Sequence, residues 1–383
     1  MVRRKSTRVT VTDRSREMLN DDDRISRLPD GVIHHIYSFI DTRFAVQSSL
    51  LSSRWRNTWK SHPYLNFKID RFTNQANPFK FPNFVHRFLS DRDNDAEVTT
   101  IDFRSNSIKL PLLKEIITYA MSHRTQKLNI EFLGDKTRRG GFDLSLFRSR
   151  FLQDLRLSID FEFLKTPTLT WDLPGLTSLN LESVTFTLHP PNDSKSIELF
   201  SRFSNLKTLM LVNCRLSNID SFIIKSNTLQ NLTLIDLNHN SDFVISAPKL
   251  SSFTYYGMAR FSLSALDLDS LQTVSFHIIY NRALQKQPEL VELMIKTFKQ
   301  LRKAKCLTVN SDLVRLLSGF PEFLERRCPF MSLKSLTLVE HRLPPSSIVF
   351  SDVIAYFRSS SPGLKVNIEL GVAPWNIRWI DCL

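Results

Sequence analysis

The chain is poor in the residues that build ligand-holding loops and covalent cross-links. Its 383 residues include 9 glycines, which argues against Gly-rich phosphate loops and collagen-like repeats. The four cysteines, at positions 214, 306, 328 and 382, stand far apart and form no C-x-x-C pair. Neither a zinc site nor a disulfide framework is therefore expected. We predict no metal site and a reducing compartment, the nucleus and/or the cytoplasm.

Membrane and catalytic signatures are also missing. No run of about 18 apolar residues occurs, so no membrane span is predicted. Residues 1–22 are charged and lack an apolar stretch, which predicts a disordered tail and no secretory signal. The patterns G-x-G-x-x-G, G-x-x-x-x-G-K-[ST], H-E-x-x-H and G-x-S-x-G do not occur. We expect no catalytic residues, no cofactor and no enzyme activity.

The chain is basic, with a formal net charge of +13 from 51 Lys and Arg against 38 Asp and Glu. A basic chain is a candidate for nucleic-acid binding. The charge is scattered, however, with no stripe of interleaved aromatic residues; its groups are Lys136-Thr137-Arg138-Arg139, Arg148/Arg150, Lys299/Arg302/Lys303/Lys305 and Arg326-Arg327. We predict a solvated basic surface rather than a nucleic-acid site. One of these groups could instead favour an acidic partner or a phosphorylated protein segment.

Residues 23–67 form a compact segment of their own kind. Pro29 and Asp30 suit the first turn of a helix. Pro29, Ile33, Ile36 and Ile40 then recur at steps of four, three and four, which predicts a helix with one apolar stripe.

Two further short helices are predicted in this segment. The apolar residues between Ala45 and Leu50 indicate the second. Ser53 suits the N-cap of the third, in which Trp55 and Trp59 would lie one above the other at i and i+4. A unit of about 40 residues rarely supports its own core, so some of its apolar surface is expected to need a partner.

The segment resembles a plant F-box. The residues that carry the resemblance are Leu28-Pro29-Asp30, Ala45-Val46, Leu51-Ser52, Arg54-Trp55-Arg56, Trp59, Pro63, Leu65 and Phe67. Two positions depart from the family pattern: Ile40-Asp41 stands where the family usually has Leu-Pro, and Phe44 stands where it has an acidic residue. These departures could alter the affinity for an adaptor.

The resemblance implies that this segment binds a Skp-type adaptor and, through it, a cullin. It implies that the adaptor interface, or the packing that shapes it, is carried by Leu28, Pro29, Ile33, Ile36, Ala45, Val46, Leu51, Trp55 and Trp59. The chain would then be the non-catalytic substrate receptor of a ubiquitin ligase. The alternative is a repeat scaffold for protein–protein interaction that works without the adaptor.

From Val98 onward the chain repeats the pattern L-x-x-L-x-L. The clear copies are Leu176/Leu179/Leu181, Leu206/Leu209/Leu211, Leu229/Leu232/Leu234 and Leu333/Leu336/Leu338. The looser or weaker copies are Val98/Ile101/Phe103, Leu128/Ile130, Leu152/Leu155/Leu157, Leu250/Phe253/Tyr255, Leu271/Val274/Phe276 and Leu307/Val309, and a closing strand is possible at Val366/Ile368/Leu370. The period varies between 21 and 33 residues. It resembles leucine-rich repeats.

The sequence therefore predicts an α/β chain in which a three-helix F-box precedes a curved leucine-rich-repeat solenoid with a parallel inner sheet. The expected division is a tail at 1–22, the F-box at 23–67, a connector and solenoid cap at 68–97, repeats at 98–370 and a C-terminal tail at 371–383. Helical spacing between repeats is seen at 112–120, at 290–298 and from Ile348 to Phe357.

Side chains that flank the strand leucines should face the concave wall, because successive residues of a strand point to opposite faces. The first such column reads Asp102, Asn129, Arg156, Asn180, Met210, Thr233, Thr254, Ser275, Thr308 and Thr337. Such small polar groups suit hydrogen bonding to a polypeptide. The next column outward turns apolar in its second half, so we predict a patch that binds a protein substrate at Met210, Val212, Ile235, Tyr256 and His277. A register error of one residue would instead place these side chains in the core.

Overall fold

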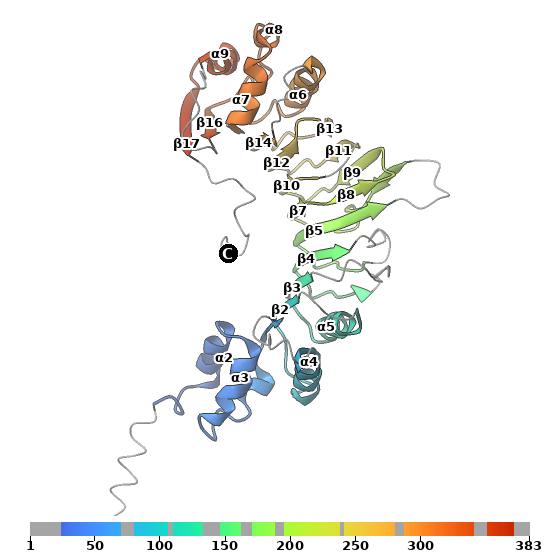
Figure 1. The fold of residues 1–383 in the computed structure, drawn as a ribbon, viewed down its shortest axis with the longest axis vertical. Helices are drawn as coiled ribbons and strands as arrows, with labels where there is room; N and C mark the ends of the chain where they lie inside the picture. Colours follow the sequence, from blue (N-terminus) through green and yellow to red (C-terminus); the bar gives the residue numbers. More distant parts are fainter. Residues whose placement is uncertain are drawn as a thin grey trace, which may run out of the picture. The chain divides into compact units, whose positions relative to one another are not determined.

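The protein is described from a computed structural model, drawn in Figure 1. The structure describes residues 24–69, 80–105, 110–132, 146–161, 171–187, 195–237, 241–279, 287–340 and 351–370. The predicted tails and the basic group at 136–139 lie outside these residues. The chain divides into two compact units, Met1–Phe103 and Arg104–Leu383.

The first unit begins with helices α2 (Asp30–Ser38) and α3 (Thr42–Gln47). In α2, Ile33 and Tyr37 are fully buried at a spacing of four, while Ile36 is 38% exposed. The buried face is therefore centred on Ile33 and Tyr37 and not on the predicted stripe of isoleucines. In α3, the side chain of Asp41 caps the N-terminus, accepting a hydrogen bond of 2.8 Å from the backbone N–H of Arg43.

The predicted third helix is wrong in type and position. After the 3-10 helix η1 (Ser48–Leu50), the chain turns over residues 53–57 and forms a second 3-10 helix, η2 (Thr58–Ser61). Hydroxyl groups compete here for the backbone groups of an α-helix. The Oγ of Ser52 accepts from the N–H of Trp55 at 3.4 Å, and the Oγ1 of Thr58 donates to the carbonyl of Trp55 at 3.0 Å.

Strand β1 (Tyr64–Lys68), helix α4 (Lys80–Asp91) and strand β2 (Thr100–Ser105) follow in the chain. β1 is a neighbour of β2 in the sheet. The ring of Phe88 on α4 lies 5.2 Å from Trp59 and 5.5 Å from Phe67, centroid to centroid. The predicted connector thus contains a helix whose aromatic face packs on the end of the F-box segment.

In the second unit, parallel strands succeed one another in one sheet. Their order is β3 (Lys127–Phe132), β4 (Asp154–Phe161), β5 (Ser178–Thr187), β7 (Thr208–Val212), β10 (Asn231–Ile235), β12 (Ser252–Met258), β14 (Thr273–Ile279), β15 (Cys306–Asn310), β16 (Ser335–Glu340) and β17 (Lys365–Leu370). A short strand, β8 (Arg215–Ser217), pairs with the outer end of β5.

These strands coincide with the predicted repeats, the weak copies included. Leu209 of β7 lies opposite both Leu179 and the leucine at 232, so the repeat leucines form buried rows across the sheet. Just before several strands, one backbone carbonyl accepts hydrogen bonds from two N–H groups of the next repeat. The carbonyl of Lys207, for example, accepts from Gln230 at 2.8 Å and from Asn231 at 2.9 Å. The predicted fold class, an α/β chain with a parallel, solenoid-like repeat sheet, is confirmed.

Left-handed backbone conformations recur at one register position of three strands without glycine. Ser183, Asn213 and Asp236 have φ angles of 60°, 49° and 47°. The residues directly before them, at 182, 212 and 235, are paired neighbours on β5, β7 and β10. Asn and Asp tolerate this left-handed conformation better than most residues. The repeated turn explains how a chain with 9 glycines closes its repeats.

The middle repeats pack against a second sheet instead of helices. Its parallel strands are β6 (Ser196–Glu198), β9 (Ser221–Lys225), β11 (Asp242–Ser246) and β13 (Leu263–Leu266), in the order β13-β11-β9-β6. Buried phenylalanines at 222, 243 and 261 follow each other with centroids 5.5 and 5.2 Å apart. The sequence analysis did not predict this sheet.

Helices flank the sheet toward both ends of the second unit (Figure 1). They are α5 (Leu110–Ser122), α6 (Pro288–Gln300), α7 (Ser311–Ser318), α8 (Pro321–Leu324) and α9 (Ser351–Ser360). The helical spacings at 112–120 and 290–298 correspond to α5 and α6, and Val353 and Phe357 lie on α9, while Ile348 is outside the described residues. The sequence analysis did not predict α7, which begins directly after β15 with the Asn310 side chain as its cap.

Candidate functional site

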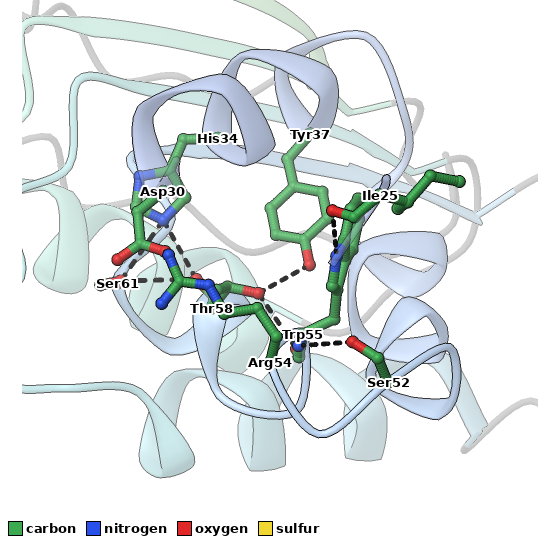
Figure 2. A network of polar contacts seen from close by, with 9 residues as sticks. All are labelled: Ile25, Asp30, His34, Tyr37, Ser52, Arg54, Trp55, Thr58 and Ser61. Atoms are coloured by element: carbon green, nitrogen blue, oxygen red, sulfur yellow. Dashed lines mark hydrogen bonds and ion pairs between the residues drawn. The ribbon is translucent and has the colours of Figure 1, made fainter. Parts of the chain in front are cut away.

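A buried hydrogen-bond network holds the elements of the F-box segment together (Figure 2). The hydroxyl of Tyr37 lies 2.7 Å from the Oγ of Ser48 and 3.0 Å from the Oγ1 of Thr58. The indole N–H of Trp55 donates to the carbonyl of Ile25 at 3.3 Å. One tyrosine of α2 therefore ties η1 and η2 to the helix, and Trp55 secures the chain ahead of it.

Two motif residues that are far apart in the sequence form an ion pair on this unit. Arg54 approaches Asp30 at 2.7 Å, and both side chains are about half exposed. Both residues are drawn in Figure 2. Beside them, the Nε2 of His34 lies 3.1 Å from the carbonyl of Thr58. An exposed ion pair contributes little stability, so its main effect is to orient the turn at 53–57 against the first turn of α2.

The nine predicted adaptor residues divide by burial. Ile33, Ala45, Trp55 and Trp59 are at most 9% exposed and belong to the packing of the unit. Leu28 and Val46 are half-buried. The three that face outward are Pro29, Ile36 and Leu51, the last of which is 66% exposed.

The structure adds apolar side chains that were not among the predicted contacts. These are Ile25 (56% exposed), Val32 (42%), Phe39 (75%), Phe44 (44%) and Leu50 (87%). Within the described part of the chain, seven of the twelve large hydrophobic residues that are exposed lie on the F-box segment. The sequence showed that this unit has more apolar residues than so short a segment can bury. It did not show which of these residues face outward.

The two departures from the family pattern have different roles. Asp41 is 8% exposed and caps α3, so it acts on the local fold and not on the surface. Phe44 is 44% exposed and adds apolar area where the family has a charge.

A buried histidine sits behind this surface. His62 is fully buried, and burial, with smaller effects from His34 and Arg92, lowers its pKa to about 3. The guanidinium of Arg92 donates to the backbone carbonyl of His62 at 2.6 Å. His62 is therefore a neutral packing residue at physiological pH.

A groove of about 390 Å³ lies between the F-box segment and α4. Val46 and Trp59 line one side, and α4 lines the other with Lys80, Asn83, Phe84, Arg87, Phe88 and Asp91. Its base is apolar and its rim carries charges of both signs. Of the predicted adaptor residues, Val46 and Trp59 thus face a recess of the unit and not its open surface.

The predicted substrate patch needs a correction. Its register is right, because Val212, Ile235, Tyr256 and His277 are direct neighbours on β7, β10, β12 and β14. Ile235, Tyr256 and His277 are nevertheless buried, at 8%, 4% and 9% exposure, and only Met210 and Val212 are partly accessible.

Part of this burial comes from α7, which packs against β14, the strand that carries His277, and against β15. Burial, and to a lesser extent the carboxylates of Asp312 on α7 and Asp236, raises the pKa of Tyr256 well above its ordinary value. A surface patch cannot be read from strand register alone when a helix from a later repeat covers the strand ends.

The first concave column follows the predicted register from Asn129 to Thr337 and continues to Asn367. In the next column outward, Arg104 pairs with Glu131 at 2.6 Å, and Glu182 of that column pairs with Arg156 of the first column at 3.6 Å. In the early repeats, charged side chains along this wall therefore form ion pairs with one another. From Thr233 to Thr337, the first column consists of Thr and Ser.

The described residues hold no group of three or more His, Cys, Asp or Glu side chains that could bind a metal ion. Cys214 is buried, and burial raises the pKa of its thiol to about 12, so it is not an activated nucleophile. Within the same residues, no helix combines the length and the apolar character needed to cross a bilayer.

Comparison with known proteins identifies the helical segment at the start of the described residues. The F-box domain family matches residues 25–67. An F-box/LRR-repeat protein of Arabidopsis thaliana is 23% identical over 354 residues, which cover 90% of this chain and 71% of the relative. A second F-box/LRR-repeat protein of that plant is 28% identical over 305 residues, covering 77% of this chain and 89% of the relative.

A third relative, an Arabidopsis thaliana F-box/FBD/LRR-repeat protein, is 31% identical over 237 residues. The match covers 60% of this chain and 49% of the relative, so the chain spans about half of that protein's length.

The helical segment and its family match make the chain an F-box protein, a class whose F-box in general binds a Skp-type adaptor. The repeats narrow this further, because the similarity to Arabidopsis proteins extends through most of the parallel sheet. The comparisons support a plant F-box/leucine-rich-repeat family, since the chain carries an F-box domain and is similar to F-box/LRR-repeat proteins of Arabidopsis thaliana. Proteins of this family work through protein–protein interaction and are generally receptors or adaptors rather than enzymes.

Proposed function

We propose that the protein is the substrate-recognition subunit of a ubiquitin ligase built from a Skp-type adaptor, a cullin and an F-box protein. The F-box segment binds the adaptor, and through it the cullin, and the repeats bind a protein substrate. The chain is non-catalytic. Its contribution is proximity, since holding a substrate lysine near the conjugating machinery raises the effective concentration of that lysine.

The observation that carries the proposal is the set of exposed apolar side chains on the F-box segment. A soluble surface rarely gathers so many large apolar residues without a partner to cover them. Here the exposed set consists of Ile25, Val32, Ile36, Phe39, Phe44, Leu50 and Leu51. Residues 24–69 also carry seven Lys and Arg against two Asp, so the partner surface is expected to be apolar and acidic.

Within this proposal the nine motif residues have two roles. Pro29, Ile36 and Leu51 contact the adaptor directly, with Leu28 and Val46 at the margin. Ile33, Ala45, Trp55 and Trp59 are buried and shape that surface. Truncating a buried contact residue typically costs about 2 kcal/mol or more of binding free energy.

The test is co-purification of the full-length chain with a recombinant Skp-type adaptor, beside a Leu28→Ala/Pro29→Ala variant. Stable binding by the wild type and loss in the variant support the receptor function. Leu266→Ala is the matched control, because this leucine is 57% exposed on the second unit and should not affect the adaptor. A folded wild-type chain that does not bind the adaptor refutes the proposal and favours the adaptor-independent scaffold.

For the substrate, the proposed face is the first concave column. Thr233, Thr254, Ser275, Thr308 and Thr337 are half-buried neighbours on successive strands, and hydroxyl groups at the spacing of strands suit hydrogen bonds to a polypeptide. Met210 and Val212 supply accessible apolar area at the adjoining repeat.

A further inference from the structure

The last strand of the large sheet is an open edge. Among the strands that the structure describes, β17 pairs with β16, in parallel, and with no other. The N–H of Lys365 donates to the carbonyl of Lys334 at 3.0 Å, toward β16. Backbone groups of a strand face its two sides alternately, so the N–H and C=O groups of residues 366, 368 and 370 point to the open side. Such an edge can accept a further strand.

The apolar face of β17 is also uncovered. Ile368 lies opposite Leu338 of β16, which is 1% exposed and belongs to the core face of the sheet. Ile368 itself is 60% exposed, and Leu370, two positions further along the same face, is 69% exposed. Large apolar side chains beside unpaired backbone groups make a surface that needs a partner.

The sequence after β17 carries a pattern that matches this edge, although residues 371–383 lie outside the described part of the chain. Residues 371–374 begin with Gly and end with Pro, both of which favour turns. From Trp375 to Trp379, apolar and polar residues alternate (W-N-I-R-W), which is the period of a strand with one apolar face. A connection of four residues has the length of a hairpin loop and is too short for the crossover that a parallel neighbour requires.

A hairpin of this length also fixes the register. With 371–374 as the loop, the opposite pairs on one face are Leu370/Trp375, Ile368/Ile377 and Val366/Trp379. All six side chains are apolar, so the segment would extend the exposed row of β17. The same register pairs the backbone groups that point to the open side. A shift by one residue would instead place Asn376 and Arg378 on the apolar row.

We propose that residues 375–380 form an antiparallel strand that pairs with β17 and covers the edge of the sheet. The occupant is this segment and not a second copy of the chain, because a four-residue connection gives the segment an effective concentration on the order of millimolar or higher. The inference goes beyond the proposed function and does not depend on it. With the edge covered, a substrate would bind through side chains of the first concave column and not by adding a strand to the sheet.

The test is disulfide trapping in the full-length chain. In the proposed register, Asn367 and Arg378 form a non-hydrogen-bonded pair, in which the Cα atoms are only about 4.5 Å apart. This separation lies within the range of a disulfide, so N367C/R378C should form an intramolecular bond under mild oxidation. Cys306→Ser and Cys382→Ser remove competing thiols. The matched control, N367C/I377C in the same background, puts the second thiol on the opposite face of the strand.

Peptide mass spectrometry and a non-reducing gel separate the outcomes. We expect at least about tenfold more intramolecular cross-link in N367C/R378C than in the control. Equal cross-linking in both would mean that the segment has no fixed register, and no cross-link in either would mean that it does not lie along β17. A disulfide-linked dimer as the main product would assign the edge to a second copy. Each of these three results overturns the proposal.

Hydrogen exchange at β17 gives a second measurement that needs no added cysteine. I377S/W379S removes two side chains of the proposed apolar row and should make the amides of Ile368 and Leu370 exchange at least about tenfold faster. N376S/R378S is the matched control, because these positions alternate with the apolar ones, and exchange should stay within about twofold of wild type. Equal exchange rates in the two variants would contradict the register.

Adaptor binding by the same variants keeps this inference separate from the proposed function. The variants all lie on the second unit and should bind a Skp-type adaptor like the wild type. If they do but show no cross-link, the inference fails and the receptor function stands.

Discussion

The exposed leucines of the F-box segment should act on adaptor binding and not on folding. Leu50 and Leu51 are 87% and 66% exposed, so little of either side chain packs within the chain. Fully burying a leucine side chain is worth about 1.5–3 kcal/mol. Scaled by these open fractions, an adaptor that covers both would gain roughly 2.3–4.6 kcal/mol. Alanine keeps the Cβ of each residue, so truncating both leucines should remove somewhat less, roughly 2–4 kcal/mol.

A Leu50→Ala/Leu51→Ala variant should therefore bind a Skp-type adaptor with a Kd raised roughly 30- to 1,000-fold. Its thermal unfolding should match that of the wild type. Isothermal titration calorimetry gives the affinity, and differential scanning fluorimetry gives the stability.

Two further variants make this test specific. Ile33→Ala removes a fully buried side chain and should lower the free energy of unfolding by about 2–5 kcal/mol. Met331→Ala removes a side chain that is 56% exposed on the second unit and should change neither quantity. Wild-type affinity in the Leu50/Leu51 variant would refute the assignment of this surface to the adaptor.

Three other predictions follow from buried polar groups. The pKa of His62 is lowered to about 3, so below about pH 6.5 the unfolded chain binds a proton that the folded unit does not. The contribution of His62 to the free energy of unfolding is therefore complete above about pH 6.5. It falls by about 1.4 kcal/mol for each pH unit toward pH 3. Urea unfolding between pH 7 and 5 should show this loss, and His62→Gln should make it shallower; equal slopes would contradict the cause given. The buried side chain of Asn310 accepts from the N–H of Ile278 at 3.1 Å and donates to its carbonyl at 2.8 Å, so Asn310→Ala should cost about 2 kcal/mol or more, and amides of β14 and α7 should exchange faster. Unchanged exchange there would count against that role. Iodoacetamide at pH 8 should label exposed Cys306 well before Cys214, because the buried thiol of Cys214 has a pKa of about 12. Peptide mass spectrometry would show the order of labelling. Early labelling of Cys214 would contradict its burial.

The sequence by itself determined the phase of the large-sheet strands from β2 to β16. A residue such as Leu209 or Leu232 faces the core because strand side chains alternate and only one phase places the leucines inside. The same alternation also predicted the weak copies of the repeat correctly: Leu128 lies in β3 and Leu307 lies in β15. The F-box was equally readable, since its motif residues stand at fixed spacing.

Only the tertiary structure decided which side chains remain accessible. Ile235, Tyr256 and His277 lie in the predicted register but are buried, and α7, from a later repeat, packs against β14, the strand that carries His277. On the F-box segment, the hydroxyl contacts of Tyr37, Ser52 and Thr58 replace the expected third helix and set which apolar residues face outward.

Neighbours across the sheet edge show the same limit. Lys305 was visible in the sequence as part of a local basic group, but its neighbour on the next repeat is Lys334, whose backbone N–H donates to the carbonyl of Lys305 at 2.7 Å. Local patterns specify which way a residue points, because strand and helix periods are short-range properties of the backbone. They do not specify which distant residue lies beside it, because the long connections between repeats vary in length and only packing brings their ends into register.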